Sequence, residues 1–184
     1  MALTREECLA IMSSYQMPAH IVRHSLLVCQ VALFLSQRLN AIGEGLNLLE
    51  VEAASLLHDI TKNESFRTGE DHAASGEGLL RKLGYPEIGE IVGRHIHLRG
   101  EMDPQRVTAE EIVNYADKRV QHDQVVTLRE RFIDLQKRYG KRNPLAAQRI
   151  GSLEQKMFRL EKKIFCRLNL KPEDLADLLA MTLL

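Results

Sequence analysis

The sequence is poor in the features that suit polynucleotide binding. It has no Trp, and aromatic residues make up only 5% of its 184 residues, so it offers few rings on which the bases of a single strand could stack. Its 25 Lys and Arg residues are balanced by 25 Asp and Glu residues, whereas polynucleotide-binding proteins usually carry a basic surplus. We therefore expect no polynucleotide partner, although this balance leaves room for a local basic pocket that binds a small phosphate compound.

Cysteine is also scarce. Cys8, Cys29 and Cys166 form no C-x-x-C pair, and each lies in an apolar helical pattern, so we expect buried, reduced thiols. No run reaches the roughly 18 apolar residues of a membrane span, and the first residues, MALTREECLA, include acidic side chains that do not suit a signal peptide. The expected protein is soluble and cytoplasmic, with no membrane partner.

Strand patterns are missing, and apolar residues recur at helical spacing almost throughout. Gly and Pro are sparse and lie where helices are expected to begin or end. The sequence therefore predicts an all-α fold, a helical bundle large enough to bury its own core. The expected helices cover residues 4–13, 18–40, 48–60, 71–84, 86–97, 109–139 and 172–182, with a loop at TKNESFRTGED.

The last third of the chain has a different apolar pattern. From Val125 to Tyr139, and again from Ala146 to Ile164, apolar residues recur at alternating steps of three and four. The segment GKRNP separates the two runs. Such a heptad seam predicts an antiparallel helical hairpin, or two arms of an oligomer interface.

Histidine is the residue type in surplus, with seven copies that all precede residue 123. His58 and Asp59 are adjacent in SLLHDITK, at the end of an apolar helix, where a charged group needs a metal ion or a hydrogen-bonding partner. Imidazole and carboxylate together suit iron, manganese, zinc or magnesium, and paired metal ions serve phosphoryl displacement. The further candidates lie in or beside apolar helical patterns: His24, His72, His95 and Asp117.

These residues resemble the HD-domain metal-dependent phosphohydrolases, in which a His, an adjacent His-Asp pair and a distant Asp all lie on helices. The matching segments are RHSLLV, LLHDITK and YADK. Two more histidines, in HAASGE and GRHI, match positions of the dinuclear branch. Within that branch the chain is most similar to the symmetrical diadenosine-tetraphosphate hydrolase group. HDITK also resembles the HD-GYP phosphodiesterases, but the GYP signature and their longer domain are missing, which argues against cyclic di-GMP hydrolysis.

The resemblance, which covers about residues 18–122, implies a set of roles. The first metal ion would be held by His24, His58, Asp59 and Asp117. Asp59 would bridge to a second ion held by His72 and His95. A metal-bound hydroxide would then attack phosphorus. The implied cofactors are two divalent ions, iron or manganese first and zinc or magnesium next.

Substrate contacts are expected from basic residues near these ligands. Lys62, one turn after Asp59, is the first candidate for the phosphate or the leaving oxygen, followed by Lys118 and Arg23. The expected substrate is a small phosphoester or phosphoanhydride, with a nucleotide preferred. Two alternatives stay open: a mononuclear HD nucleotidase in which His72 contacts phosphate, and a nucleotide-sensing module without turnover.

This interpretation divides the chain into an HD phosphohydrolase domain over residues 1–122 and a helical extension over residues 123–184. The extension would pack on the domain or form a homodimer through the C-terminal helices. Its Lys and Arg residues are expected to form a solvated face.

Other polar residues have simpler expected roles. His97 should be exposed to solvent, and His20 should lie at the surface or beside the ligands. His122 and Asp123 should point away from the ligands around one long helix. Asp71 should cap the helix that follows it.

Overall fold

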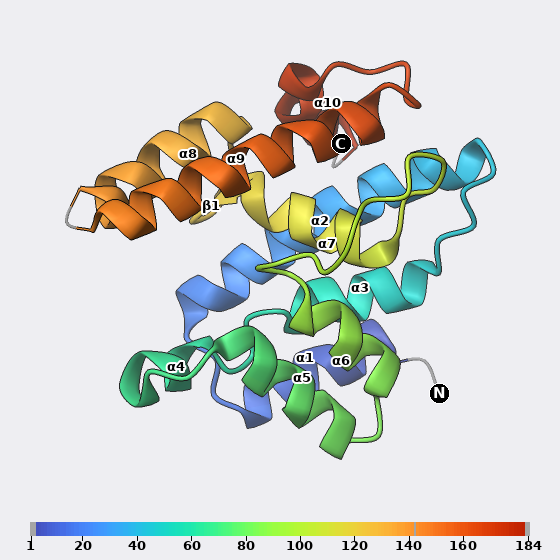
Figure 1. Cartoon of the computed structure of the whole chain (residues 1–184). Coiled ribbons are helices and arrows are strands. Elements are labelled where there is room, and N and C mark those ends of the chain that lie inside the picture. Colours follow the sequence, from blue (N-terminus) through green and yellow to red (C-terminus); the bar gives the residue numbers. More distant parts are fainter. Residues whose placement is uncertain (1–2, 142, 183–184) are drawn as a thin grey trace.

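A computed structural model describes residues 3–141 and 143–182, and almost all of its regular structure is helical (Figure 1). The elements of the first half are α1 (Arg5–Ser14), α2 (Ala19–Ala41), α3 (Leu48–Leu57), α4 (Lys62–Thr68), α5 (His72–Lys82) and α6 (Pro86–Gly93). Those of the second half are α7 (Ala109–Lys118), β1 (Val120–Gln121), β2 (Gln124–Val125), α8 (Leu128–Leu135), η1 (Gln136–Gly140), α9 (Pro144–Phe165), η2 (Pro172–Asp174) and α10 (Leu175–Met181). The expected all-α fold is confirmed.

Several helices begin at residues whose side chains cap them. Thr4, Thr108 and Thr127 each accept a hydrogen bond from the backbone of the third helical residue, and the Glu at that position bonds back to the threonine N–H. These capping boxes satisfy first-turn amides that have no partner within the helix. Asp71 caps α5 by accepting from Ala73 N, as the sequence predicts.

The core is built around α2, which packs on α3 and α7. Val28, Val31, Leu35 and Leu39 lie on its fully buried face, and each such side chain stabilises the fold by about 1.5–3 kcal/mol relative to an exposed position. Below this layer, α6 packs against α3 and is itself paired with α5 (Figure 1). The polar residues discussed below lie where these helices meet.

α2 is also long and apolar enough to cross a membrane by length and composition alone, and no other helix in residues 3–141 and 143–182 is. More than half of its apolar window, 56%, is buried inside the protein. Polar residues such as Arg23, His24 and Arg38 interrupt it, which is why no uninterrupted apolar run stands out in the sequence. The buried core helix of a soluble protein has the same hydropathy.

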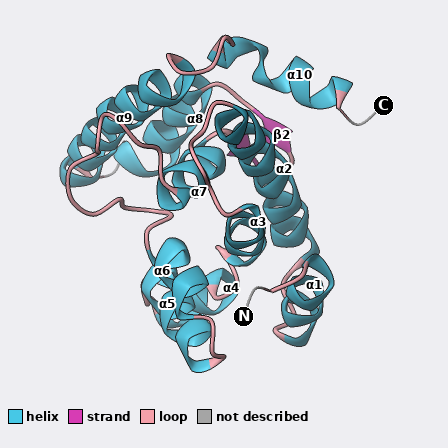
Figure 2. Cartoon of the chain, turned by 90° about the vertical axis from the view of Figure 1, so that its right-hand side faces the viewer, coloured by secondary structure: helices cyan, strands magenta, loops and turns pink. Residues whose placement is uncertain are grey.

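The C-terminal segment forms the expected helical hairpin, in which α8 and η1 lie beside α9 (Figures 1 and 2). α9 then crosses α7, where Lys163 forms an ion pair of 2.6 Å with Glu111. The buried Arg119 donates to Glu161 Oε2 at 3.2 Å and to the Pro172 carbonyl at 2.7 Å. These contacts attach the hairpin to α7, the helix that carries Asp117.

The prediction of one continuous helix over residues 109–139 is wrong, because the helix is interrupted near its middle. α7 ends at Lys118, and Val120 and Val125 pair as antiparallel strands before α8 begins. His122 occupies the turn between them with a φ of 58°, a left-handed conformation that is uncommon outside glycine. Apolar residues continue through this region at near-helical spacing, which hides the break.

Two smaller expectations also differ from the structure. The segment 62–68, expected as a loop, forms the short helix α4, which ends at Gly69 with a φ of 76°. Cys8 and Cys29 are buried as expected, but Cys166 is exposed because it follows α9 on the side away from Ile164 and Phe165.

Candidate metal and phosphate site

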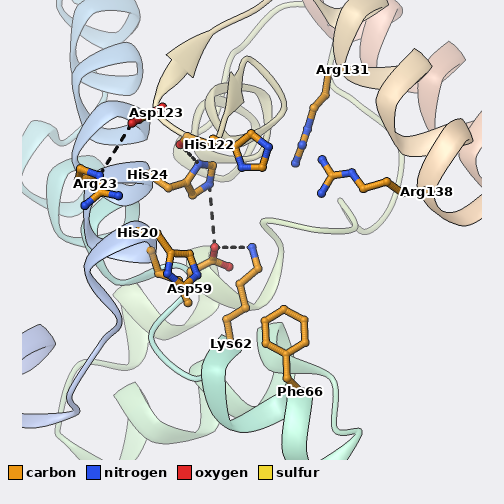
Figure 3. A pocket seen from close by; sticks show the side chains of 11 residues that line it. His20, Arg23, His24, Asp59, Lys62, Phe66, His122, Asp123, Arg131 and Arg138 are labelled. Atoms are coloured by element: carbon orange, nitrogen blue, oxygen red, sulfur yellow. Dashed lines mark hydrogen bonds and ion pairs between the residues drawn. The ribbon is translucent and has the colours of Figure 1, made fainter.

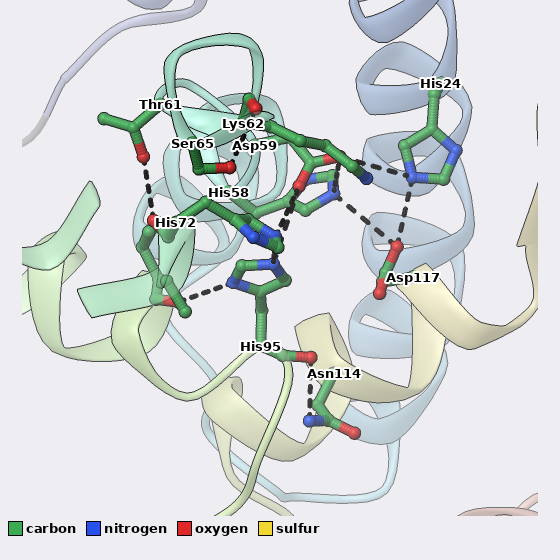
Figure 4. Close-up of polar contacts among 12 residues, drawn as sticks. His24, His58, Asp59, Thr61, Lys62, Ser65, His72, His95, Asn114 and Asp117 are labelled. Carbon is green, nitrogen blue, oxygen red and sulfur yellow. Dashed lines mark hydrogen bonds and ion pairs between the residues drawn. The ribbon is translucent and has the colours of Figure 1, made fainter. Parts of the chain in front are cut away.

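The histidines and aspartates singled out in the sequence converge from five elements (Figure 4). His24 lies on α2, Asp117 lies on α7, and His58 and Asp59 occupy the turn directly after α3. His72 is the first residue of α5, and His95 follows the end of α6. Their spread over the chain explains why only the tertiary fold brings them together.

Three of the imidazoles are oriented in the same way by the backbone. Nδ1 of His24 lies 3.2 Å from the His122 carbonyl, Nδ1 of His58 lies 2.8 Å from Ser55 O, and Nδ1 of His95 lies 2.7 Å from Val92 O. Because a carbonyl oxygen can only accept, each Nδ1 carries the hydrogen. Each Nε2 therefore faces the centre, as in metal-ligating histidines.

Asp59 lies between two groups of these imidazoles and is only 1% exposed. Its Oδ2 lies 3.4 Å from Nε2 of His58 and 4.0 Å from Nε2 of His24. Its Oδ1 lies 3.3 Å from Nε2 of His72 and 3.6 Å from Nε2 of His95. The donor atoms thus form two clusters of metal-ligand type that share Asp59.

Asp117 completes the first cluster. Its Oδ1 lies 3.0 Å from Nε2 of His24 and 3.6 Å from Nε2 of His58. Its Oδ2 accepts a hydrogen bond of 2.5 Å from Lys118, whose Nζ also donates to the His95 carbonyl at 3.2 Å. Lys118 therefore holds Asp117 of the first cluster and His95 of the second in position.

This placement differs from the substrate contact expected of Lys118. The side chain is buried behind the ligands and does not line the cavity described below. It faces inward because the Asp117 carboxylate and the His95 carbonyl are acceptors that a buried ammonium group needs. Asn114 supports the same carbonyl with a hydrogen bond of 2.9 Å.

Both carboxylates of the cluster are in the form that binds metal ions, whereas His58 must first lose a proton. Burial disfavours charge on His58, but the carboxylates of Asp59 and Asp117 outweigh it and raise the pKa of His58 to about 10. Burial also opposes charge on both carboxyls, yet His58 holds the pKa of Asp59 well below its usual range and Lys118 does so for Asp117. Burial lowers the pKa of His95. Ionised carboxylates and neutral imidazoles are the forms that bind divalent ions.

Two buried polar atoms of the clusters indicate that a metal ion binds here. Nε2 of His58 and Oδ1 of Asp59 have no hydrogen-bonding partner among the residues that the structure describes. Buried polar atoms are rarely left unpaired, and here both atoms face the centres of the two clusters. The residues present therefore fit divalent metal ions.

A cavity of about 260 Å³ opens beside the first cluster and is lined by His24 and Asp59 (Figure 3). Lys62 lies at this boundary, where its Nζ donates to Asp59 Oδ2 at 2.6 Å. Burial lowers the pKa of Lys62, but Asp59 and Asp117 outweigh it and the net shift is upward, so the side chain is a cation. Arg23, the third expected substrate contact, also lines the cavity and lies 3.9 Å from Asp123.

The cavity contains residues that the sequence patterns do not identify. His122 and Asp123 line it because the chain turns back at His122 instead of continuing as a helix. Arg131 of α8 and Arg138 of η1 also line it, although hairpin charges were expected on a solvated face. The alternation of Arg131, Asp134 and Arg138 at helical spacing is the signal that could have identified that face.

The remaining candidates lie outside the clusters. His20 is exposed and lines the cavity, and His97 is exposed as expected.

Comparison with known proteins agrees with this geometry. The HD domain family model matches residues 21–139, well over half of the chain, and the protein belongs to the HD domain family. The match contains every ligand candidate and continues through α8. No curated protein and no solved structure matches the chain. HD domains are generally metal-dependent hydrolases, and the His/Asp clusters described here are of the type that binds divalent ions.

Proposed function

We propose that this protein is a dinuclear metal-dependent phosphohydrolase that cleaves a phosphoester or phosphoanhydride of a small nucleotide-like substrate. The observation that carries the proposal is the position of Asp59, whose two oxygens face separate histidine pairs. His24 and His58, with Asp117, would hold one ion. His72 and His95 would hold the other, and Asp59 would join them.

Residues around the metal clusters would bind the substrate and orient the ligands. Divalent ions bound here would supply an activated water and positive charge for the phosphoryl oxygens. Lys62 borders both the ligands and the cavity, so its ammonium group is placed to contact a phosphate oxygen or the leaving oxygen. Lys118 and Asn114 position ligands from behind, and the backbone carbonyls keep each Nε2 directed inward.

A diadenosine polyphosphate is the first substrate to test, because the ligand pattern resembles the symmetrical diadenosine-tetraphosphate hydrolase group. Arg23 and Lys62 supply positive charge in the cavity, which suits a substrate with several phosphates. We also propose that the substrate is a nucleotide and that the protein acts in the cytoplasm.

The experiment is a turnover assay on protein loaded separately with Fe²⁺ under low oxygen, Mn²⁺, Zn²⁺ or Mg²⁺. The substrates are diadenosine tetraphosphate, nucleoside tri- and monophosphates and bis(p-nitrophenyl) phosphate. We expect metal-dependent turnover that Asp59→Ala abolishes and that Asp177→Asn, on the exposed side of α10, retains. Metal-loaded protein that is inert toward all of them would contradict the enzyme and favour the nucleotide-sensing alternative. Turnover with one ion per chain would favour the mononuclear nucleotidase.

We also propose a homodimer through the C-terminal helices. Apolar side chains remain exposed on the hairpin, among them Ile133, Tyr139, Leu145 and Phe158, and a second copy of the chain would cover them. Sedimentation equilibrium should give about twice the chain mass of 21.0 kDa. A mass of one chain would contradict the dimer and leave the hairpin's contacts with α7 unchanged.

A further inference from the structure

Two arginines of the hairpin face the same cavity as the metal ligands. Arg131 lies on α8 and Arg138 on η1, seven residues apart and so on one side of the helical segment. Both line the cavity, and Figure 3 shows their guanidinium groups directed into the space bounded by Lys62, His122 and Phe66 (Figure 3). The hairpin thus forms the wall of the cavity opposite Lys62.

Asp134 holds this pair in place. Its Oδ2 accepts a hydrogen bond of 2.7 Å from Nε of Arg138 and lies 3.9 Å from Nη1 of Arg131. One carboxylate between two guanidinium groups leaves an excess of positive charge. The Arg131 side chain is only 15% exposed, and its Nε has no hydrogen-bonding partner among the described residues. A solvated surface arginine would show neither feature.

The charges that line the cavity are uneven. Its cations are Arg23, Lys62, Arg131 and Arg138. Its carboxylates are Asp59, which faces the histidines and pairs with Lys62, and Asp123, which lies near Arg23. On the hairpin side, the two guanidinium groups share the carboxylate of Asp134, which does not line the cavity. Paired guanidinium groups bind phosphate through charge-assisted, bidentate hydrogen bonds.

We propose that Arg131 and Arg138 form a second phosphate subsite, which binds a phosphate group adjacent to the one held at the metal clusters. The substrate class is then a nucleoside or dinucleoside polyphosphate, not a compound with a single phosphate. This inference rests on the proposed function for the position of the first phosphate. It also gives the hairpin a role in recognition.

An aromatic residue at the same cavity suits the nucleoside part. Phe66 of α4 lines the cavity and is 75% exposed, so its ring is accessible from the cavity. A base stacked on this ring would cover it. The phosphates would then extend from the metal clusters toward α8, with the base near α4.

The test measures binding of imidodiphosphate, a two-phosphate probe that resists hydrolysis, and of orthophosphate as its one-phosphate counterpart. Calorimetry is carried out on metal-loaded, full-length protein in excess Mg²⁺. Arg131→Gln and the more exposed Arg138→Gln remove one charge each, so that either variant suffices if the other fails to fold. Arg129→Gln, on the exposed side of α8, is the matched control.

The wild-type protein should bind imidodiphosphate at least about tenfold more tightly than orthophosphate, because only the former reaches charge-assisted bonds at both subsites. Each cavity variant should lose most of this preference, and Arg129→Gln should keep it. Equal affinity for the two probes, or an unchanged preference in both cavity variants, would overturn the inference.

A nucleotide probe extends the same measurement. Phe66→Ala should weaken binding of adenosine 5′-(β,γ-imido)triphosphate by about tenfold and leave imidodiphosphate binding unchanged. Equal affinity of wild-type and Phe66→Ala protein for the nucleotide would overturn the placement of the base. A protein that shows the two-phosphate preference but turns over no phosphoester would contradict the proposed function while supporting the subsite.

Discussion

Replacing Arg119 by Met should loosen the attachment of the C-terminal hairpin. The guanidinium group is 1% exposed and donates to four acceptors, which are Tyr115 Oη, Glu161 Oε2 and the carbonyls of Val126 and Pro172. Met retains most of the side-chain volume but leaves the partly buried Glu161 without its cation. Because Tyr115 still donates to that carboxylate at 2.5 Å, part of the interaction survives.

The expected cost follows from these contacts. Removing one partner of a buried ion pair typically costs about 3–5 kcal/mol, and the remaining tyrosine bond places this case near the lower figure. For a chain of this size, about 3 kcal/mol corresponds to a Tm lowered by roughly 6–12 °C. Denaturant and thermal unfolding followed by circular dichroism measure both quantities, and Arg159→Met, on the exposed side of α9, is the control. A loss below about 1 kcal/mol would refute the reasoning that Arg119 anchors the hairpin.

Three further predictions concern the metal clusters and their surroundings. His72→Ala should lower the metal content to about one ion per chain, since only the second cluster loses a ligand; His97→Ala should keep the wild-type content, and equal loss of both ions would contradict the two-cluster assignment. Because the pKa of His58 is raised to about 10, one proton must leave when the ion binds, so metal affinity should rise about tenfold per pH unit between pH 7 and 9; competition with a chelator measures this, and a flat profile would count against it. Lys62→Ala should retain the metal ions and lower kcat by roughly a hundredfold, and wild-type turnover in this variant would exclude the phosphate role.

The candidate ligands could be singled out in the sequence because they are conspicuous locally. His58 and Asp59 end an apolar helix, and a buried charge at such a position needs a partner. His24 and Asp117 interrupt apolar helical faces in the same way. Each signal depends on neighbours within a few residues, which a sequence displays directly.

The cavity was not predictable by the same reasoning. The turn at His122 depends on a left-handed residue that is not glycine, so no Gly marks the end of α7. When the turn is not predicted, Arg131 is assigned to an exposed helix, and its charge indicates only a solvated surface. Lys118 has no local signal for its inward direction, because its acceptors include a carbonyl after α6, distant in the sequence.

The central claim is that Asp59 joins two metal ions, and the metal content of protein purified without chelator tests it most directly. Elemental analysis of the wild type should give about two divalent ions per chain. Asp59→Ala should bind neither ion tightly, because losing a support of a ligand already costs about 10–100-fold in affinity and here both clusters lose a ligand itself. One ion per chain in the wild type, or two ions retained by Asp59→Ala, would contradict the shared carboxylate and the dinuclear mechanism that rests on it.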